Sequence, residues 1–486
     1  MNILFVVSEA VPLVKSGGLG EYAGSLPKTL ASLGVDVRVM LPAHEEIAGG
    51  YRCKFREAVA GTLKMGGELQ HWRLLEADVQ GIHYYLLENA HYFGRRGLYG
   101  YDDETERYVF YCLAAALAIR ELAFQPDIIH CHDWQTALLP ALLERDAQVG
   151  NYAHIPSILT IHNMHYQGKA EKAQFRRWLG LRPGEEKGLF LPLQENQAGS
   201  DKEWVSCLEL GLTTASRVTT VSPSYADEIA EEPLGAGLSH IVRQRWGGVR
   251  GICNGIDTVS YDPTGDPAVP YPYASWRGKR LNKAALQRRL GLREDAGAPL
   301  FAIVSRLVWQ KGLDLVISLL EQLVARGIQL AVIGAGEAYY ESVLHSAATQ
   351  YPGSLSVHTT FEDSLARQFY AGADFLLMPS LYEPCGISQR IALQYRTIPI
   401  VRLIGGLKDT IVPFDPLTGQ GSGFAFEEYH PEELLAAVDR ALQTYHDRNR
   451  WDALHTSIAA LDLSWQSSAS AYLSTYLETV ISSHTS

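Results

Sequence analysis

The sequence predicts an α/β protein built on two doubly wound parallel sheets. With 486 residues, the chain is longer than one ordinary hydrophobic core accommodates, so two domains are expected. Short, uninterrupted apolar runs alternate with helix-like segments in both halves, as in parallel sheets covered on both faces. In each half, one apolar run leads into a loop of cations and small residues. These observations favour two open sheets, each with an anion site at the carboxyl ends of its strands.

The apolar runs of the first half define its predicted strands. They are Ile3–Val7, Val35–Leu41, Asp127–His130, Ser157–Thr160 and Val218–Val221. Between the first two, Glu21–Leu33 is predicted to be a helix that stops at Gly34.

The second half repeats this alternation more regularly. Its predicted strands are Leu300–Val304, Gln329–Ile333, Asp374–Met378 and Ile398–Val401, and its predicted helices are Leu313–Ala325, Glu337–Gln350 and Gly386–Arg396. Strands and helices in this order are typical of a doubly wound unit.

Tryptophan and glycine near the middle of the chain mark the predicted domain boundary. Trp246-Gly247-Gly248 interrupts the alternation, so the first domain is predicted over 1–245 and the second over 246–463. The remaining segment, 464–486, contains a predicted helix over Trp465–Ile481. We expect this helix to pack back on the first domain.

The bulk composition excludes several classes of function. The formal charge is −12, which disfavours a nucleic-acid surface but leaves room for a local phosphate site. The six cysteines form no Cys-x-x-Cys pair, and their scatter fits a reducing compartment. The chain opens on a strand, and no apolar run is long enough to cross a bilayer. We therefore expect a cytoplasmic protein. The stretch Tyr261–Arg280, rich in Pro, Gly and Tyr, is expected to be irregular surface chain.

The loop Lys15-Ser16-Gly17-Gly18-Leu19-Gly20 is the first candidate binding element. It is no Walker loop, because Val14 stands where a Gly would precede the Lys. It is a poor dinucleotide fingerprint too, because it lies well beyond the end of its strand and no acid closes the second strand. What remains is a glycine-rich turn that lets a phosphorylated substrate approach the backbone. The alternative is a turn required only by packing.

Arg306 and Lys311 form the second candidate element. Both follow the strand Leu300–Val304, and two cations on one loop can converge on a diphosphate. At an effective dielectric near 20, each charge about 4 Å from an opposite one is worth roughly 4 kcal/mol. Two such cations could hold a leaving diphosphate without a metal. The alternative is a pair of solvated surface charges.

Two glycine-containing motifs follow later strands of the second half. Glu383-Pro384-Cys385-Gly386 can offer a carboxylate to sugar hydroxyls and backbone N–H groups to a ligand, although a helix-capping acid is equally compatible. Gly405-Gly406-Leu407, with Asp409-Thr410 behind it, repeats this arrangement one unit later.

Histidines close two strands of the first half. His132-Asp133-Trp134 and His162-Asn163 could bind a metal or a sugar, but no third metal ligand is evident. For His130 we expect a core position. The acidic run Asp102–Glu106 is expected to be a helix start rather than a cation site.

At these residues the chain resembles bacterial glycogen synthases of the starch-synthase type, over nearly its whole length. The motifs appear in family order. They are Lys15–Gly20, His132–Trp134, Ile161–Asn163, Tyr166–Gly168, Val221–Pro223, Asn254–Asp257, Arg306 with Lys311–Asp314, Pro379-Ser380, Glu383–Gly386 and Gly405–Leu407. The resemblance implies a GT-B fold, in which two Rossmann-like domains face each other across a cleft. It implies a retaining transferase that moves glucose from ADP-glucose to the non-reducing end of an α-1,4-glucan, in glycogen biosynthesis, with no metal and no cofactor.

The resemblance also implies roles for single residues. The first domain would be the acceptor side and the second the nucleotide-sugar side. The implied catalytic residues are Glu383, Arg306, Lys311, His162 and Asp133. The implied substrate-binding residues are Lys15, Gly17, Gly18, Asn163, Asn254, Cys385, Gly386, Gly406, Thr410 and, for the nucleotide base, Tyr99. No metal ligand is expected, and the partners are the nucleotide sugar and the glucan, with no nucleic acid and no membrane.

Several positions depart from the family pattern. They are Glu21 in place of Asp, Ile391 in place of an aromatic residue, Arg396 in place of Gly, Leu403-Ile404 in place of Arg-Thr, and Lys408. Ile391 also stands where related transferases carry a second Glu, so a two-carboxylate mechanism of retention is not expected. These departures concern the donor nucleotide and the acceptor more than the fold. A transferase with another nucleotide or a small acceptor, and a catalytically silent glucan-binding homologue, are the alternatives.

Overall fold

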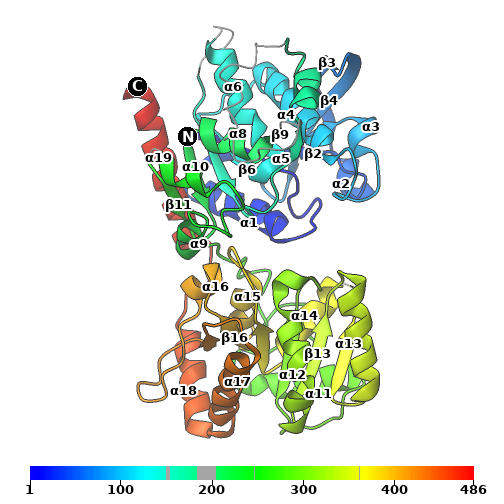
Figure 1. Cartoon of the computed structure of the whole chain (residues 1–486), viewed down its shortest axis with the longest axis vertical. Coiled ribbons are helices and arrows are strands. Elements are labelled where there is room, and N and C mark those ends of the chain that lie inside the picture. The colour runs from blue at the N-terminus through cyan, green and yellow to red at the C-terminus, as the bar shows by residue number, and fades with distance from the viewer. Residues whose placement is uncertain (149–153, 183–203, 246, 361, 486) are drawn as a thin grey trace, which may run out of the picture. The chain divides into compact units, whose positions relative to one another are not determined.

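The computed structural model describes residues 1–148, 154–182, 204–245, 247–360 and 362–485 (Figure 1). Within these ranges the chain divides into two compact units. Unit 1 comprises Met1–Val221, Ala226–Ile252 and Trp465–Ser486, and unit 2 comprises Ser222–Tyr225 and Cys253–Ser464. Trp246, at the predicted domain boundary, lies outside the described residues.

Unit 1 is built on a sheet with the strand order β11-β10-β7-β6-β1-β2-β5-β4-β3. The strands are β1 Asn2–Val6, β2 Asp36–Pro42, β3 Arg56–Met65, β4 Glu68–Val79, β5 Ile82–Glu88, β6 Ile128–His132, β7 Ser157–Ile161, β10 Arg217–Thr220 and β11 Val249–Gly251. The strands from β11 to β5 in this order pair in parallel. The chain adds β2 and β5 on one side of β1, and β6, β7 and β10 on the other. The order therefore reverses between β1 and β6.

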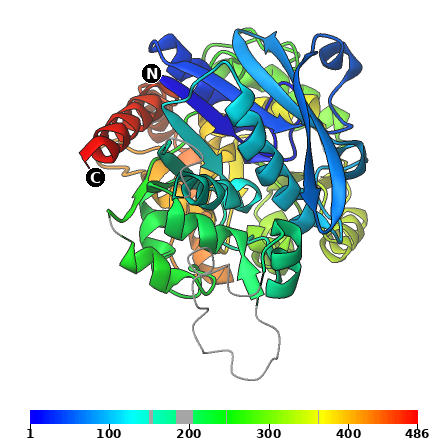
Figure 2. The ribbon, with the colours of Figure 1, turned by 90° about the horizontal axis from the view of Figure 1, so that it is seen from above.

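An antiparallel extension enlarges this sheet at one edge. Strand β4 pairs with both β5 and β3, and β3 and β4 are the long arrows at the side of the sheet in Figure 2. These strands were not predicted from the sequence. A small separate ribbon pairs β8 Lys169–Glu171 with β9 Trp204–Ser206.

Helices cover the unit 1 sheet. They are α1 Gly18–Ser32, α2 Gly49–Arg52, α3 Ala90–Phe93, α4 Glu104–Glu121, α5 Asp133–Thr136, α6 Leu138–Gln148, α7 Lys172–Leu179, α8 Cys207–Thr214, α10 Ser239–Gln244 and α19 Gln466–Thr485. Helix α9, Pro223–Glu228, begins in unit 2 and ends in unit 1. The C-terminal helix α19, red in Figure 2, packs beside α1. Trp465, Ala469, Tyr472 and Tyr476 recur at helical spacing and join the unit 1 core. The predicted helix at this end of the chain thus belongs to unit 1.

Unit 2 contains a wholly parallel sheet with the order β14-β13-β12-β15-β16-β17. The strands are β12 Leu300–Val304, β13 Gln329–Ile333, β14 Leu355–His358, β15 Phe375–Met378, β16 Ile398–Arg402 and β17 Phe424–Phe426. In sequence rank this is 3-2-1-4-5-6, the order of a Rossmann sheet, with its reversal between β12 and β15. Both units are therefore doubly wound, and the predicted α/β fold class is confirmed.

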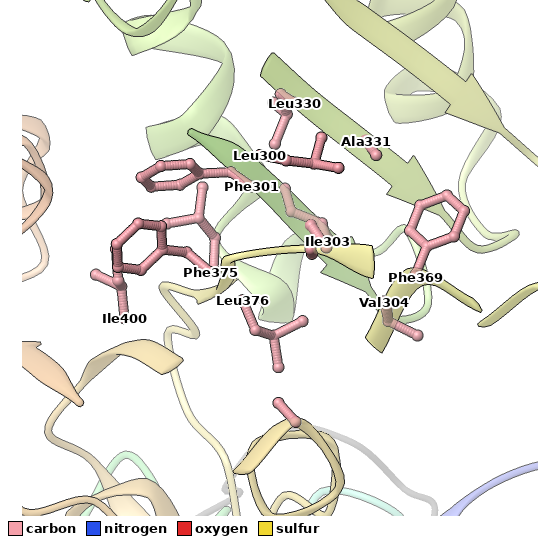
Figure 3. Close-up of a cluster of buried hydrophobic side chains, with 14 of the residues drawn as sticks. Leu300, Phe301, Ile303, Val304, Leu330, Ala331, Phe369, Phe375, Leu376 and Ile400 are labelled. Atoms are coloured by element: carbon pink, nitrogen blue, oxygen red, sulfur yellow. The ribbon is translucent and has the colours of Figure 1, made fainter. Parts of the chain in front are cut away.

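The core of unit 2 lies on both faces of this sheet. Phe301 and Phe375, on the neighbouring strands β12 and β15, bring their ring centroids within 4.7 Å, and Figure 3 shows them among the surrounding aliphatic side chains. The covering helices are α11 Lys279–Arg289, α12 Leu313–Ala325, α13 Ala338–Gln350, α14 Asp363–Gly372, α15 Ser388–Gln394, α16 Gly405–Thr410, α17 Pro431–His446 and α18 Arg448–Ala459, with single 3-10 turns at Trp276–Gly278 and Trp309–Lys311. No helix in the described ranges is both long and apolar enough to span a membrane.

Two local predictions need correction. The segment Tyr261–Arg280 is irregular over most of its length, but it is not surface chain throughout, because Tyr261, Val269 and Tyr273 are buried in the unit 2 core. Helix α15 is shorter than predicted, because Gly386 and Arg396 adopt positive φ angles of 66° and 58°. A left-handed residue on each side ends the helical path.

Candidate functional site

The candidate site residues of unit 2 lie at the point where its strand order reverses. The loops after β12 and β15 leave the carboxyl ends of adjacent strands, and open α/β sheets bind ligands in the crevice outside such ends. The first loop carries Arg306 and Lys311, and the second carries Glu383. The topology thus brings together residues that lie 72 positions apart in the chain.

Lys311 and Glu383 form a largely buried ion pair at this point. Lys311 Nζ donates to Glu383 Oε2 over 2.6 Å, and Ser380 Oγ donates to the same oxygen over 3.0 Å. The Lys311 and Glu383 side chains are only 17% and 8% exposed. A solvated surface lysine is therefore the wrong description of Lys311. Glu383 is no helix cap either, because α15 begins only at Ser388 without a side-chain cap.

Arg306 differs from Lys311 in its surroundings. Its side chain is exposed, and within the described ranges it makes no hydrogen bond or ion pair. The loop that carries it is held by backbone hydrogen bonds from Leu307 N to Ala335 O and from Glu337 N to Leu307 O. A cation on a fixed loop can meet an anion without ordering the backbone of the loop, and only its own side chain loses freedom.

Glycine is required where this loop turns toward β15. Gly312 adopts φ 69°, and a Cβ there would lie 2.0 Å from the Pro379 carbonyl oxygen. Any larger residue would push apart the loops that carry Lys311 and Glu383.

The Cys385 region is built from close backbone contacts. A Cβ on Gly406 would lie 2.2 Å from the Cys385 carbonyl oxygen, and the Gly406 N–H donates to the Glu383 carbonyl oxygen over 3.0 Å. This N–H is therefore used within the protein. Burial raises the pKa of the Cys385 thiol to about 12, so the thiol is neutral and a weak nucleophile.

Asn254 and Thr410 complete the predicted residues of unit 2. Asn254 is buried, and its Oδ1 has no hydrogen-bond partner in the described part of the chain. The Thr410 hydroxyl donates to the Gly406 carbonyl oxygen and accepts from the Gln389 side-chain amide. Gln389, which the sequence analysis missed, also donates to the carbonyl oxygens of Cys385 and Gly386. It ties the two glycine-containing motifs together.

In unit 1, a buried carboxylate organises the glycine-rich loop. Glu9 follows β1 and is 2% exposed, and its two oxygens accept from the backbone N–H groups of Ser16 and Gly20. Burial raises the pKa of Glu9. The sequence analysis missed Glu9, although an acid directly behind a buried strand and ahead of a glycine-rich turn is a usable signal.

The glycines of this loop fall into two groups. A Cβ on Gly20 would lie 2.6 Å from the Lys15 Cβ, and a Cβ on Gly24 would lie 2.1 Å from Val11 Cγ2. Gly17 and Gly18, in contrast, have open space where a Cβ would be. Packing within the unit therefore does not require glycine at these two positions, and the interpretation of the loop as a turn demanded by packing fails for them.

Lys15 contacts an acid of α1. Its Nζ lies 2.7 Å from Glu21 Oε1, and the Lys15 side chain is 32% exposed. Glu21, one of the departures from the family pattern, thus supplies a carboxylate to Lys15.

Asp133 joins the loops after β6 and β7. Its Oδ1 accepts from the backbone N–H groups of His162, over 2.6 Å, and of Asn163, over 3.2 Å. Asp133 adopts φ 55°, a left-handed conformation that costs a non-glycine residue free energy. Burial raises the pKa of Asp133 to about 7. The structure thus places three predicted site residues next to one another.

The histidines near Asp133 are neutral. Burial lowers the pKa of His162 to about 3 and lowers those of His130 and His132 well below the usual range. His132 Nδ1 lies 3.3 Å from His162 Nε2. His130 is fully buried between Tyr476 and Thr160, as expected of a core histidine. In the described ranges no group of three or more His, Cys, Asp or Glu side chains is arranged to hold a metal ion.

Tyr99 also lies at the carboxyl end of β1. Its hydroxyl is 2.8 Å from Ser8 Oγ, and its ring is 6.3 Å from that of Tyr108. The structure thus places Tyr99 in unit 1, beside the strand end that leads into Glu9.

The acidic run Asp102–Glu106 lies at the start of α4, as predicted. Asp103 pairs with Arg95, Glu104 accepts from the Gly100 N–H, and Glu106 accepts from the Tyr92 hydroxyl. These acids are used for local structure.

The remaining departures from the family pattern lie in unit 2. Ile391 is buried in the hydrophobic core, and Ile404 precedes α16 with an extended backbone. Arg396 holds a left-handed backbone, and its side chain makes no hydrogen bond or ion pair within the described ranges.

Comparisons with known proteins agree with this architecture. Residues 2–244 match the starch synthase catalytic domain family, and residues 287–454 match the family of group 1 glycosyl transferases. The glycogen synthase of Oceanobacillus iheyensis is 40% identical over 478 residues, covering 98% of this chain and 97% of the relative. That of Geobacillus stearothermophilus is 39% identical over 479 residues, with the same coverage.

Comparison with solved structures also finds a starch synthase and the same fold. The catalytic domain of starch synthase IV from Arabidopsis thaliana, bound to ADP and acarbose, superposes with a TM-score of 0.91 at 29% identity, covering 98% of this chain and 99% of that one. Sucrose-phosphate synthase from Thermosynechococcus elongatus, with a TM-score of 0.63 at 15% identity, shares the fold; it covers 99% of this chain and 100% of that one.

Two doubly wound units, each with polar loops at its strand reversal, define a glycosyltransferase with the GT-B fold. Within that class, the chain belongs to the starch synthase family, together with the bacterial glycogen synthases. The predicted resemblance is confirmed.

Proposed function

We propose that this enzyme transfers glucose from ADP-glucose to the non-reducing end of an α-1,4-glucan and retains the α configuration. The observation that carries the proposal is the arrangement of Arg306, Lys311 and Glu383 at the strand reversal of unit 2. The family membership supports it, and so does the starch synthase IV structure, which contains ADP and acarbose.

Unit 2 holds the nucleotide sugar in this proposal. Arg306, which has no partner within the described chain, meets the diphosphate, and Lys311 adds a second positive charge. Glu383 accepts hydrogen bonds from hydroxyl groups of the glucose, since Lys311 and Ser380 occupy only its Oε2. The backbone at Cys385 and Gly386 and the Asn254 Oδ1 line the sugar, while Gly406 and Thr410 support this backbone.

In this proposal, unit 1 supplies the residues that line the reacting face of the glucose. Lys15 and the open backbone at Gly17 and Gly18 approach the phosphates and the glucose. His162 and Asn163 face the sugar, held by the Asp133 carboxyl, and Tyr99 contacts the base. Each of these roles is assigned by position in the family motifs.

The chemistry follows from charge. As the bond between the anomeric carbon and the diphosphate breaks, the carbon becomes cationic and the diphosphate gains negative charge. Fixed cations stabilise that charge, which lowers the barrier. The acceptor hydroxyl then bonds to the carbon from the face that the diphosphate left. Its proton passes to a departing phosphate oxygen, so no protein base is needed.

Two observations support retention without a carboxylate nucleophile. Ile391 is buried in the core, at the position where a second acid would stand in related transferases. Glu383 forms an ion pair with Lys311, which makes its carboxylate a weaker nucleophile. We propose further that the reaction needs no metal, because Arg306 and Lys311 take the place of one. A cytoplasmic location fits the scattered cysteines.

The decisive experiment incubates the protein with ADP-glucose or UDP-glucose and a glucan primer, with and without chelator. We expect ADP release, chain elongation with α-linked product by NMR, and no effect of the chelator. Inverted product, or activity abolished by chelator and restored by a divalent ion, would contradict the mechanism. No turnover with any primer would favour a silent homologue, against which the retained charged residues already argue.

Because Arg396 and Ile404 depart from the family pattern, there is one alternative, a transferase with a different donor or a small acceptor. The same assay distinguishes it. A preference for UDP-glucose, or transfer to glucose or maltose in place of the glucan, would establish it.

A further inference from the structure

Two histidines of unit 1, the buried His132 and the partly buried His162, share one hydrogen bond, and its direction has consequences for the candidate site. His132 Nδ1 lies 3.3 Å from His162 Nε2. Both imidazoles are neutral because burial lowers the pKa of each. A neutral imidazole carries one N–H donor and one lone pair, so a single proton lies between the two rings.

The other nitrogen of His132 shows where that proton belongs. His132 is fully buried, and its Nε2 has no hydrogen-bond partner among the described residues. A buried N–H without an acceptor is rarer and more costly than a buried lone pair without a donor. His132 Nε2 is therefore the bare nitrogen, and the His132 proton is on Nδ1.

This assignment fixes the state of His162. We infer that His132 donates through Nδ1 to His162 Nε2 and so holds His162 in the tautomer that carries its proton on Nδ1. Within the described ranges His162 Nδ1 has no partner. The site thus presents a donor from His162 Nδ1 to the substrate, and His132 is a positioning residue that acts through His162.

Ring contacts with residues of β1, α1 and β6 keep the His132 ring in place. The rings of Phe5 on β1 and Tyr22 on α1 lie 5.1 and 5.2 Å away, and that of His130 on β6 lies 4.2 Å away. His130 is itself anchored by hydrogen bonds to Thr160 and to the Tyr476 hydroxyl of α19. The C-terminal helix is therefore connected to His162 through two imidazoles.

A second contact from α19 reaches His162 through Tyr22. The Tyr22 ring meets His162 edge to face at 4.7 Å, and Tyr22 in turn meets Trp465 at 5.4 Å and Tyr472 at 6.0 Å. Both routes restrict the orientation of the His162 ring. The catalytic consequence rests on the proposed function, whereas the tautomer itself does not.

The first experiment measures the tautomer in the full chain without substrate. Protein labelled with 15N only at histidine is examined by long-range 1H–15N NMR near neutral pH, and the His162 signals are identified by their loss in His162→Asn. We expect a protonated Nδ1 and a bare Nε2 for His162, and the same pattern for His132. A proton on His162 Nε2 would overturn the inference, whatever the enzyme turns out to transfer.

The second experiment uses two replacements of His132. In His132→Asn, the side-chain amide keeps a donor near the position of Nδ1, whereas His132→Leu keeps the bulk and loses the donor. We expect kcat to fall roughly 10- to 100-fold in His132→Leu, with a smaller change in KM, because a misplaced reacting group costs about that much. In His132→Asn we expect kcat within about threefold of the unmodified enzyme.

Further variants separate positioning from folding. Tyr476→Phe removes only the hydroxyl that anchors His130; because the bond from His132 to His162 remains, it should keep the His162 tautomer. Leu477→Ala, at a side chain of the same helix that is 48% exposed, should leave both the spectrum and kcat unchanged. A folded His132→Leu protein with the original His162 tautomer and the original kcat would refute the positioning role. If His132→Leu does not fold, the spectra of the unmodified protein and of Tyr476→Phe still decide.

Discussion

The two units place polar side chains at equivalent edges of similar sheets, yet the electrostatic character of the two sites differs. At the strand reversal of unit 2, the buried groups are charged and paired, as in Lys311 and Glu383. At the strand reversal of unit 1, burial raises the pKa values of Glu9 and Asp133 and lowers those of His132 and His162. Every one of these shifts favours the neutral form.

The contrast indicates that the two units have different roles in the proposed reaction. In the proposed mechanism, a diphosphate leaving group needs fixed positive charge, and this role falls to the cations of unit 2, where a compensating carboxylate is already in place. Hydroxyl groups of a sugar need directed donors and acceptors without strong fields, which neutral imidazoles and backbone groups supply. Substitutions that remove a charge should therefore have larger effects in unit 2 than in unit 1.

The largest effect is expected for Lys311→Met. In the proposed mechanism, loss of the ammonium removes a cation from the leaving diphosphate; it also leaves the Glu383 carboxylate buried without its partner. We expect kcat/KM to fall by about a hundredfold or more, and the free energy of unfolding to fall by about 3–5 kcal/mol. Steady-state kinetics and urea denaturation measure the two quantities.

The matched control is the double variant Lys311→Met with Glu383→Gln. It replaces the pair by two neutral groups of similar shape, so most of the lost stability should return while activity stays low. Recovery of activity in the double variant would show that the charge of Lys311 serves only to neutralise Glu383.

The next effect contrasts two glycines of one loop in unit 1. Gly20→Ala places a Cβ 2.6 Å from the Lys15 Cβ, and we expect a loss of about 1–3 kcal/mol in unfolding free energy. Gly18→Ala meets open space and should leave stability unchanged or raise it by up to about 1 kcal/mol. If substrate approaches the backbone at Gly18, KM for the nucleotide sugar should nevertheless rise in Gly18→Ala. An unchanged KM would restrict this loop to a structural role.

Much of unit 2 could be predicted from the sequence alone. The strands Leu300–Val304 and Gln329–Ile333 and the helix Leu313–Ala325 were predicted with the bounds that the structure shows. Both strands are buried on both faces, so their sequences are apolar runs interrupted only by the buried Gln329. The sequence also predicted that cations and an acid follow β12 and β15.

Other features depend on contacts that the local sequence does not specify. The antiparallel strands β3 and β4 carry many exposed polar residues, so no apolar run marks them. The pairing of Lys311 with Glu383 and the use of Glu9 to hold the loop at Ser16 and Gly20 depend on how distant loops meet. The sequence identified residue types at strand ends, but the partners of those residues follow only from the fold.

A smaller effect is expected in the pH dependence of stability. Burial raises the pKa of Asp133 from 3.8 to about 7, so between these values the folded protein keeps a proton that the unfolded chain releases. The contribution of Asp133 to stability therefore falls as the pH rises through this range. Asp133→Asn removes this contribution. We expect the Tm of the variant, relative to the unmodified protein, to increase between about pH 4.5 and pH 7.5. A constant difference across that range would show that Asp133 is ionised throughout.

The smallest effect on stability is expected for Arg306→Gln, which makes it the most selective test of the comparison. Arg306 is exposed and has no partner within the described ranges, so its removal should change the unfolding free energy by less than about 0.5 kcal/mol. Because the same cation is proposed to meet the diphosphate, kcat/KM should still fall by about tenfold or more. The fall should shrink at high ionic strength, where salt screens an exposed charge. Normal turnover in Arg306→Gln would show that Lys311 alone supplies the positive charge that meets the diphosphate, and that Arg306 is only a surface residue.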